Sequence, residues 1–304
     1  MTESGIPRVS IVIPHLNQPE FLARCLAALA PQIAAVTDAE TIVVDNGSKT
    51  LPAAICAPYP WVKLTQEATP GPGPARNLGI SKAQGILLAF IDADCVPDPH
   101  WLSSILAAFE SNPAVVIAGG DVRIGLTDAA RPTALEAYEC VFAYRQKDYI
   151  EQAGFSGTGN LAMRRQAFEA VGPFAGIELA EDRDWGRRAN ARGLRIHYLE
   201  SMIVYHPARQ SFAELRGKWD RHVSHDYADL SPGLKGKMIW AGLALAVAVS
   251  GVMDCRKIVV SNRLSTFRER LLAAVILARI RLYRSSRMLS QLFRADYQSR
   301  KWNR

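Results

Sequence analysis

Short runs of apolar residues alternate along the first 125 residues with segments that have helical periodicity. Residues 9–14, 40–45 and 86–92 read as buried strands, residues 61–66 as a weaker strand, and residues 114–124 as a further strand. Between them, apolar positions recur on one helical face in residues 20–33, and further helices are predicted from about Ala75 to a stop at Gly85 and over residues 99–113. Apolar strands that alternate with helices are typical of parallel sheets. The pattern therefore predicts an α/β fold, with a mostly parallel central sheet flanked by helices.

Beyond residue 125 the pattern changes to longer segments. Residues 133–150 read as helical, residues 156–165 as a loop of small residues, and residues 201–205 as a short strand that ends at His206. A C-terminal helical extension is predicted over residues 232–304. Within it, residues 238–253 carry no charge. As a helix they would span roughly 24 Å, which is less than the ~30 Å hydrocarbon core of a bilayer.

Positive charge is concentrated in this extension. From Cys255 to Arg304 there are 13 Lys and Arg but only 2 Asp and Glu, so residues 1–254 carry −4 within a whole-chain charge of +7. Apolar residues recur at helical spacing among the arginines, which is typical of a helix that lies on an anionic membrane surface. We therefore expect residues 238–293 to bind such a surface and not nucleic acid. A helical pair packed against the body and a true span stay open as alternatives.

The N-terminal segment has no basic stretch followed by a long apolar one, so no secretory signal peptide is expected. The five cysteines form no C-x-x-C pair, which argues against a zinc ribbon or a disulfide framework and fits a reducing compartment. With the basic extension, these features predict a cytoplasmic protein that is peripheral on the inner face of the cell membrane.

Carboxylates cluster where one buried strand ends. Asp92 and Asp94 are separated by one alanine, so on an extended strand their side chains would point the same way. Adjacent carboxylates repel each other unless a cation lies between them, and hard oxygen ligands suit Mg²⁺ or Mn²⁺. An Asp-rich turn is the alternative. Asp45 ends another buried strand, and the carboxyl ends of parallel strands meet at one sheet edge, which favours a ligand site.

A glycine- and proline-rich segment, residues 71–77, could be mistaken for a dinucleotide-binding loop. Its sequence GPGPARN lacks the third glycine of G-x-G-x-x-G, and no strong strand runs straight into it. The segment therefore does not indicate NAD binding, and a loop with a solvated Arg76 is the plain alternative.

The chain resembles the family-2 glycosyltransferases with the GT-A fold in six segments that occur in the family's order. They are VSIVIPHLNQPEFLARCLAAL, TIVVDNGSKT, GPGPARNLGISKAQG, LLAFIDADCVPDPHWL, GTGNLAMRRQAFEAVGPF and AEDRDWGRRANARGLRI. The resemblance covers roughly residues 8–215. It implies a GT-A domain over residues 1–231, in which residues 8–125 bind the nucleotide and residues 126–231 hold the acceptor and the catalytic base. Residues 232–304 would form the helical extension.

The resemblance also implies roles for residues at the strand ends. Pro14, Asp45 and Arg76 would line the nucleotide pocket, with Asp92 close to the ribose. Asp94 would bind Mn²⁺ or Mg²⁺, which bridges to the diphosphate. Since Asn46 stands where many relatives have a second Asp, the pocket departs mildly from the family pattern.

The segment AEDRDW carries the implied catalytic base. Asp182 takes that role by resemblance, and the backbone N–H groups at a helix start would keep its carboxylate ionised. Asp184 is a competing candidate, and a routine acidic first turn is the structural alternative. The residues implied on the donor-sugar and acceptor side are Gly159, Asn160, Glu181 and Trp185.

A histidine placed after a short strand completes the metal shell in related enzymes, so His206 is a second candidate metal ligand. Neutral imidazole suits Mn²⁺ better than Mg²⁺. A structural histidine is the alternative. His15 and His197 receive no such role.

The resemblance implies inverting transfer of one sugar from a nucleotide-diphosphate sugar, by family default a UDP-sugar. The acceptor would be a saccharide or a lipid-linked molecule, in cell-surface polysaccharide or glycolipid biosynthesis. The Q-x-x-R-W signature of processive synthases is absent. A sugar-phosphate nucleotidyltransferase is the alternative within enzymes, but no glycine follows the first strand. A non-catalytic sugar- or nucleotide-binding module is the other, but the acidic positions are all present.

Overall fold

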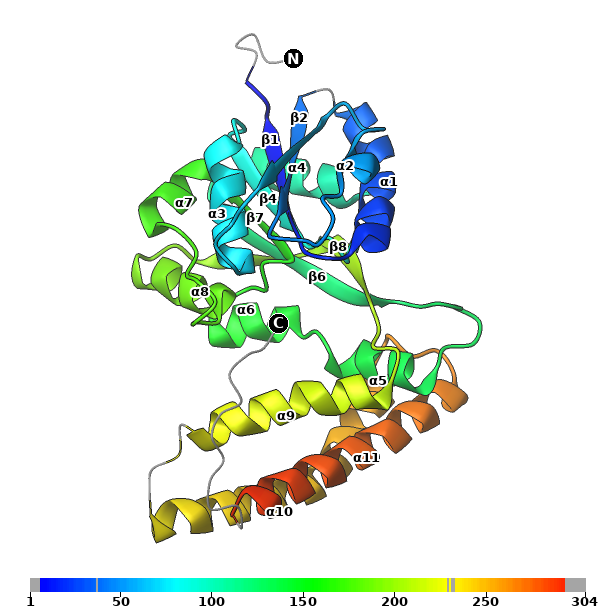
Figure 1. Cartoon of the computed structure of the whole chain (residues 1–304). Coiled ribbons are helices and arrows are strands. Elements are labelled where there is room, and N and C mark those ends of the chain that lie inside the picture. Colours follow the sequence, from blue (N-terminus) through cyan, green and yellow to red (C-terminus); the bar gives the residue numbers. More distant parts are fainter. Residues whose placement is uncertain (1–5, 37, 229, 231–232, 293–304) are drawn as a thin grey trace. The chain divides into compact units, whose positions relative to one another are not determined.

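The computed structural model describes residues 6–36, 38–228, 230 and 233–292 (Figure 1). The chain divides into two compact units. Of the described residues, the first unit contains those within 6–125 and 145–207, and the second contains those within 126–144 and 208–292. This division differs from the predicted boundary at residues 231/232, because two helices before that boundary pack with the C-terminal ones. Phe293, the end of the expected membrane-binding stretch, lies outside the described residues.

An eight-stranded sheet with the order β3-β2-β1-β4-β7-β6-β8-β5 forms the first unit. The strands are β1 (Val9–His15), β2 (Ala39–Asp45), β3 (Val62–Gln66), β4 (Leu87–Ile91), β5 (Val96–Pro97), β6 (Ile117–Gly125), β7 (Asn160–Arg164) and β8 (Ile196–Pro207). Strands β3, β2, β1 and β4 run parallel, and β6 runs parallel to β8. Only β7 and β5 pair antiparallel to their neighbours among the described strands. The predicted mostly parallel sheet is therefore confirmed.

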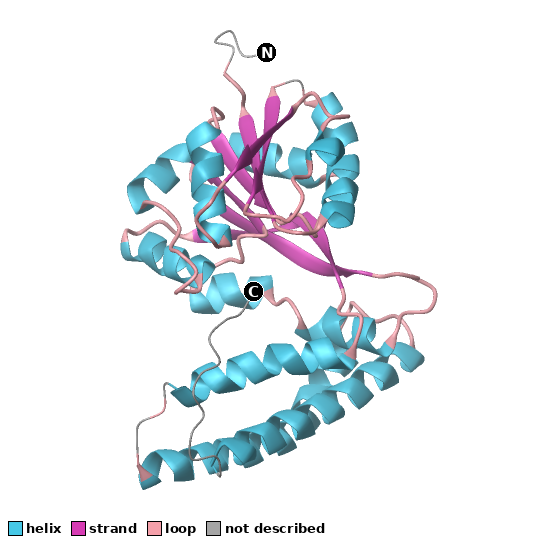
Figure 2. Cartoon of the chain, viewed as in Figure 1, coloured by secondary structure: helices cyan, strands magenta, loops and turns pink. Residues whose placement is uncertain are grey.

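Helices lie on both sides of this sheet, as Figure 2 shows. They are α1 (Pro19–Ala35), α2 (Ala53–Cys56), α3 (Pro72–Lys82), α4 (Trp101–Ser111), α6 (Gln146–Ala153), α7 (Arg165–Val171) and α8 (Glu181–Ala191). One core cluster joins the fully buried Phe90 of β4 to Phe174 and to Trp185 of α8. Helix α8, which carries the predicted catalytic base, is thus anchored to the sheet by aromatic packing.

Three local predictions need correction. Residues 160–164, expected within a loop, form the inner strand β7, because β4 and β6 pair with it from both sides. Helix α3 begins at Pro72 instead of near Ala75, since Gly71 has a φ of 120° that favours glycine, and proline suits the first helical turn. The expected helix over 133–150 is interrupted after Phe142 and resumes at Gln146, and its two parts belong to different units.

The second unit is helical. It contains α5 (Ala134–Phe142), α9 (Phe212–Ala228), α10 (Leu234–Val260) and α11 (Phe267–Leu292). Helix α5 begins with a capping box between Thr133 and Glu136. Helix α10 is long and apolar enough, by length and composition alone, to cross a membrane. Of the residues in its most apolar 18-residue stretch, 11% are buried.

Candidate active site

Parallel strand ends bring the first predicted residues together. The register of β1 and β2 places His15 opposite Asp45, and His15 Nδ1 lies 3.0 Å from Asp45 Oδ1. Both side chains are almost fully buried. Burial alone would raise the pKa of Asp45, but hydrogen bonds from Ser48 and His15 outweigh it and hold that pKa below its ordinary value. Asp45 is therefore kept as an anion that orients the loop after β2, next to the half-buried Pro14.

His15 is a residue that the sequence did not single out, since a lone histidine after a strand is usually structural. Its ring also accepts a hydrogen bond of 3.2 Å from the backbone N–H of Gln18. Asn46, the mild departure from the family pattern, donates to the carbonyls of Glu67 and Thr69 and accepts from the N–H of Gly71. An amide side chain is suited to this bracing of the loop because it both donates and accepts.

Arg76 connects two of the predicted motifs. Its guanidinium is buried and donates to Asp92 at 2.6 Å and to Glu181 at 3.0 Å. Asp92 follows β4, whereas Glu181 begins α8, so one side chain ties the strand edge to the helix of the predicted base. Arg76 was expected to line the nucleotide pocket, with a loop and a solvated arginine as the alternative; in the structure it is buried within α3 and holds the two carboxylates.

Asp94 and His206 meet through the short pairing of β5 with β8. Val96 is opposite Tyr205 and Pro97 is opposite Val204, which brings His206 Nε2 to 3.4 Å from Asp94 Oδ2. His206 Nδ1 lies 2.7 Å from the carbonyl oxygen of Pro207, so Nδ1 carries a proton and Nε2 faces the carboxylate.

The electrostatics of this pair fit a cation. Burial would raise the pKa of Asp94, but His206 and Gln18 outweigh it and lower the pKa. Burial would lower the pKa of His206, but Asp94 raises it. The two side chains therefore stabilise a positive charge between them. In the absence of a metal this charge is a proton, and a divalent ion could take its position. Two cis ligands at about 2.1 Å from one ion lie about 3 Å apart, close to the observed separation. Within the described residues, no group of three or more His, Cys, Asp or Glu forms a metal cluster.

Asp182 and Asp184 differ in their contacts in the first turn of α8. Asp184 accepts a hydrogen bond of 2.8 Å from Arg188, whose guanidinium also donates to the carbonyls of Val171 and Pro173. The recorded side-chain contact of Asp182 is a bond of 2.7 Å from the N–H of Arg183. Through Arg188, Asp184 thus helps to hold the loop that precedes α8. The carboxylate of Asp182 can still accept a hydrogen bond from another partner.

Gly159 lies against the Asp92 carboxylate. A Cβ atom at this position would come within 2.5 Å of Asp92 Oδ2, so only glycine permits this approach without displacing the carboxylate. The structure therefore brings Gly159 together with Asp92, in line with its predicted position close to the site.

Asn160 and Trp185 are not placed as predicted. Asn160 is fully buried, donates to the carbonyls of Asp121 and Met202 and accepts from Trp101. Trp185 is 1% exposed, and its indole N–H donates to the carbonyl of Gly172. The polar groups of Asn160 bind neighbouring strands, and the ring of Trp185 packs in the core. Neither side chain can contact a sugar in this structure.

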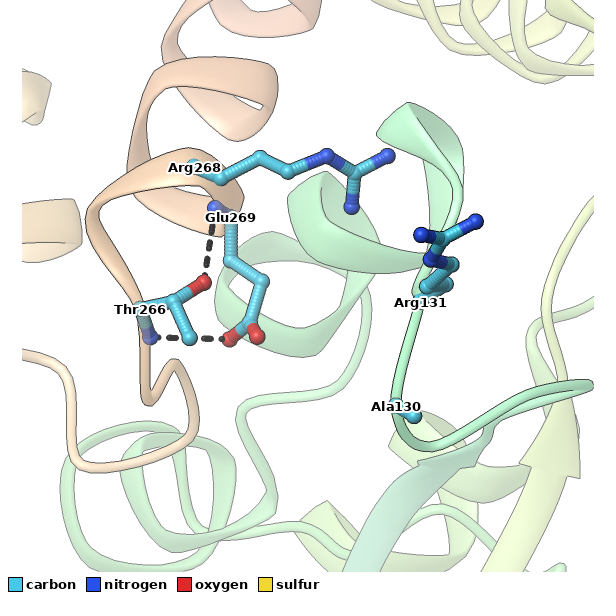
Figure 3. A pocket seen from close by; sticks show the side chains of 5 residues that line it. All are labelled: Ala130, Arg131, Thr266, Arg268 and Glu269. Carbon is cyan, nitrogen blue, oxygen red and sulfur yellow. Dashed lines mark hydrogen bonds between the residues drawn. The ribbon is translucent and has the colours of Figure 1, made fainter.

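A cavity of about 440 Å³ lies in the second unit and contains none of the predicted residues (Figure 3). Its lining consists of Ala130, Arg131, Thr266, Arg268 and Glu269. Thr266 and Glu269 use their side chains to cap the start of α11. This cavity therefore adds nothing to the candidate site.

Comparison with known proteins decides the class of this site. Residues 10–172 match the family described as glycosyl transferase family 2. The chain belongs to that family. The glycosyltransferase AglE of Haloferax volcanii is a relative of this chain. The two are 33% identical over 221 residues, which are 71% of this chain and 71% of AglE. The validoxylamine A glucosyltransferase of Streptomyces hygroscopicus is 34% identical over 122 residues, 38% of this chain and 29% of that enzyme.

Solved structures agree on the fold. The mannosyltransferase PcManGT from Pyrobaculum calidifontis, in complex with GDP-Man and Mn²⁺, aligns with a TM-score of 0.57 at 16% identity, over 94% of this chain and 86% of that one. Glucosyl-3-phosphoglycerate synthase from Mycobacterium tuberculosis, in complex with Mn²⁺ and UDP, aligns with a TM-score of 0.52 at 19% identity, over 70% and 76%. The predicted GT-A architecture of this family-2 glycosyltransferase is therefore confirmed.

Proposed function

We propose that this family-2 glycosyltransferase transfers one sugar, with inversion, from a nucleotide-diphosphate sugar to an acceptor hydroxyl. The observation that carries the proposal is the joining of the Asp94–His206 pair, the Arg76–Asp92–Glu181 bridge and the α8 start in one fold. Solved structures of the same fold, in complex with UDP or GDP-Man together with Mn²⁺, support a nucleotide-sugar donor. A UDP-sugar is the first donor to test.

Asp94 and His206 would hold the divalent cation. When bound, the cation supplies positive charge that stabilises the nucleoside diphosphate as it leaves. A carboxylate oxygen and an imidazole nitrogen form a donor set that favours Mn²⁺ over Mg²⁺. Asp45 and Pro14, at the neighbouring strand ends, would position the nucleobase of the donor, and Asp92 would position its ribose.

Asp182 would act as the general base. Its carboxylate takes the proton of the acceptor hydroxyl while that oxygen bonds to the anomeric carbon and the bond to the diphosphate oxygen breaks. A base of this kind contributes about 10²–10⁴-fold to the rate. Arg76 would keep α8 and the Asp92 edge in register through its two ion pairs. The acceptor is proposed to be a saccharide or a lipid-linked molecule of cell-surface polysaccharide or glycolipid biosynthesis.

A panel of nucleotide sugars tests this proposal, with release of nucleoside diphosphate measured in Mn²⁺, in Mg²⁺ and in EDTA. We expect release in Mn²⁺ and its loss in EDTA and in Asp94→Ala, with a weaker Mn²⁺ response in His206→Gln. Full activity of Asp94→Ala would contradict the metal assignment. A nucleotidyltransferase would instead release pyrophosphate from a nucleoside triphosphate and a sugar phosphate, and a binding module would bind donor without turnover.

A further inference from the structure

Helix α10 exposes an apolar stripe that the exposed Arg256 interrupts near its C-terminal end. Its members are between 62% and 81% exposed: Leu234, Met238, Leu245, Val249, Val252, Met253, Val259 and Val260. At 3.6 residues per turn these positions fall within about a third of the helix circumference. The opposite side of α10 carries the buried Trp240, Ala244 and Ile258. The helix is therefore apolar on two sides, of which the described part of the chain covers only one.

Basic residues stand near both ends of the stripe, inside its outermost apolar residues Leu234 and Val260. Lys235 and Lys237 precede its central part, and Arg256 and Lys257 follow it, all exposed. Residues 234–292 contain 11 Lys and Arg against 2 Asp and Glu. This charge opposes pairing with a second copy of the same face and complements an anionic phospholipid surface. Helix α11 adds a narrower stripe of exposed apolar residues, Phe267, Leu271, Val275 and Leu282.

Contacts between α10 and α11 argue against a transmembrane span. The Trp240 indole donates to the carbonyl of Met288, and Asp254 pairs with Arg281, so the two helices run antiparallel along the apolar part of α10. The α11 segment between these contacts also contains Arg284 and Arg287. A span by α10 would carry these arginines into hydrocarbon, which is strongly unfavourable. A helix lying in the interface leaves them on the side away from the acyl chains.

We propose that the α10–α11 hairpin docks this protein on an anionic phospholipid bilayer, with α10 in the plane of the interface and its outer stripe inserted among the acyl chains. Burial of the stripe supplies the apolar part of the binding energy, and the flanking Lys and Arg supply the part that depends on anionic lipid. The docking is independent of the sugar-transfer chemistry proposed above.

Flotation of the full chain with vesicles tests this surface. We expect binding to phosphatidylcholine vesicles that contain phosphatidylglycerol, weaker binding to phosphatidylcholine alone, and release by alkaline carbonate. The double variant Val249→Glu/Val252→Glu should lower vesicle partitioning by about tenfold or more. Its matched control is Ile86→Glu/Ile177→Glu, which changes two exposed apolar residues of the first unit in the same way and should float like the parent.

Three results would overturn the proposal: no flotation of the parent chain, flotation of the Val249/Val252 variant equal to that of the parent, or resistance to carbonate, which would indicate a span. Light scattering on the unbound chain would reveal the competing use of the stripe, self-association. Release of nucleoside diphosphate by the docking variant without vesicles is measured in parallel, so failure of docking is distinguishable from failure of the sugar-transfer proposal.

Discussion

Arg76 and Asp92 form a 2.6 Å hydrogen-bonded ion pair, and the same buried guanidinium reaches Glu181 at 3.0 Å. The consecutive elements α3 and β4 and the start of α8, which is remote in sequence, therefore share one charge-assisted contact. A planar guanidinium can serve two carboxylates at once, which a lysine ammonium does with far less geometric control.

Replacement of Arg76 should affect both stability and turnover. Arg76→Met would leave two carboxylates without their partner and lower the free energy of unfolding by about 1–3 kcal/mol, the range being reduced because Asp92 is partly exposed. Arg76→Lys should have a free energy of unfolding closer to that of the parent, but a lower affinity for the donor. Urea unfolding and calorimetric titration of the donor measure the two effects, and unchanged donor binding in both variants would contradict the bridging role.

Asp182→Asn and Asp184→Asn should behave differently. Loss of the base should lower kcat by about 10²–10⁴-fold in Asp182→Asn, with donor binding preserved. Asp184→Asn removes the ion pair with Arg188, so we expect a stability loss of about 0.5 kcal/mol and nearly normal kcat. Steady-state kinetics on the two purified variants decide between them. The opposite pattern would move the base to Asp184.

Gly159→Ala tests the close approach to Asp92. The added methyl would meet the carboxylate at 2.5 Å and displace it, so we expect donor turnover to fall by about tenfold or more. Gly217→Ala is the matched control, because a Cβ there meets no atom within 4 Å. Equal turnover of the two variants would show that the Asp92 position tolerates displacement.

Trp185 should behave as a core residue and not as a sugar platform. Trp185→Ala is expected to lower the free energy of unfolding by about 3–5 kcal/mol, and Trp185→Phe by about 1 kcal/mol through loss of the bond to Gly172. Thermal melts and kinetics are compared for both. A Trp185→Phe variant with parental stability but a raised acceptor KM would restore the acceptor role.

The stability of the second unit should rise in mildly alkaline solution. Burial, followed by the charge of Arg209, lowers the pKa of Lys218 to about 8, although Glu139 opposes the shift. The unfolded chain, with the higher pKa, keeps its proton longer, so stability rises as pH increases from about 8 towards 10.5. Relative to Lys218→Met, the parent should gain about 1–2 kcal/mol over this window. Melting curves at pH 7, 8, 9 and 10 check the difference, and a constant difference would contradict it.

Local patterns were sufficient for most elements of the parallel half. The continuous apolar runs at 9–14, 40–45 and 86–92 correspond to β1, β2 and β4. Both faces of these strands are covered, so the lack of polar alternation was enough to predict buried strands. Strand β7 escaped prediction because its five residues follow a glycine-rich segment and its partners, β4 and β6, are remote in sequence. The small residues near 156–160 favour a turn, so the whole segment was predicted as a loop and the short strand within it was missed.

Residue type and order by themselves determined the class of protein, the strand-end carboxylates and the apolar, basic C-terminal helices, since these follow from composition, period and motif. Only the tertiary structure decided which side chains meet. It joined Asp94 to His206 through the β5–β8 pairing, gave Arg76 two carboxylates and turned Asn160 and Trp185 into the interior. Contacts of this kind depend on packing between segments far apart in the chain, and local propensity carries no information about them.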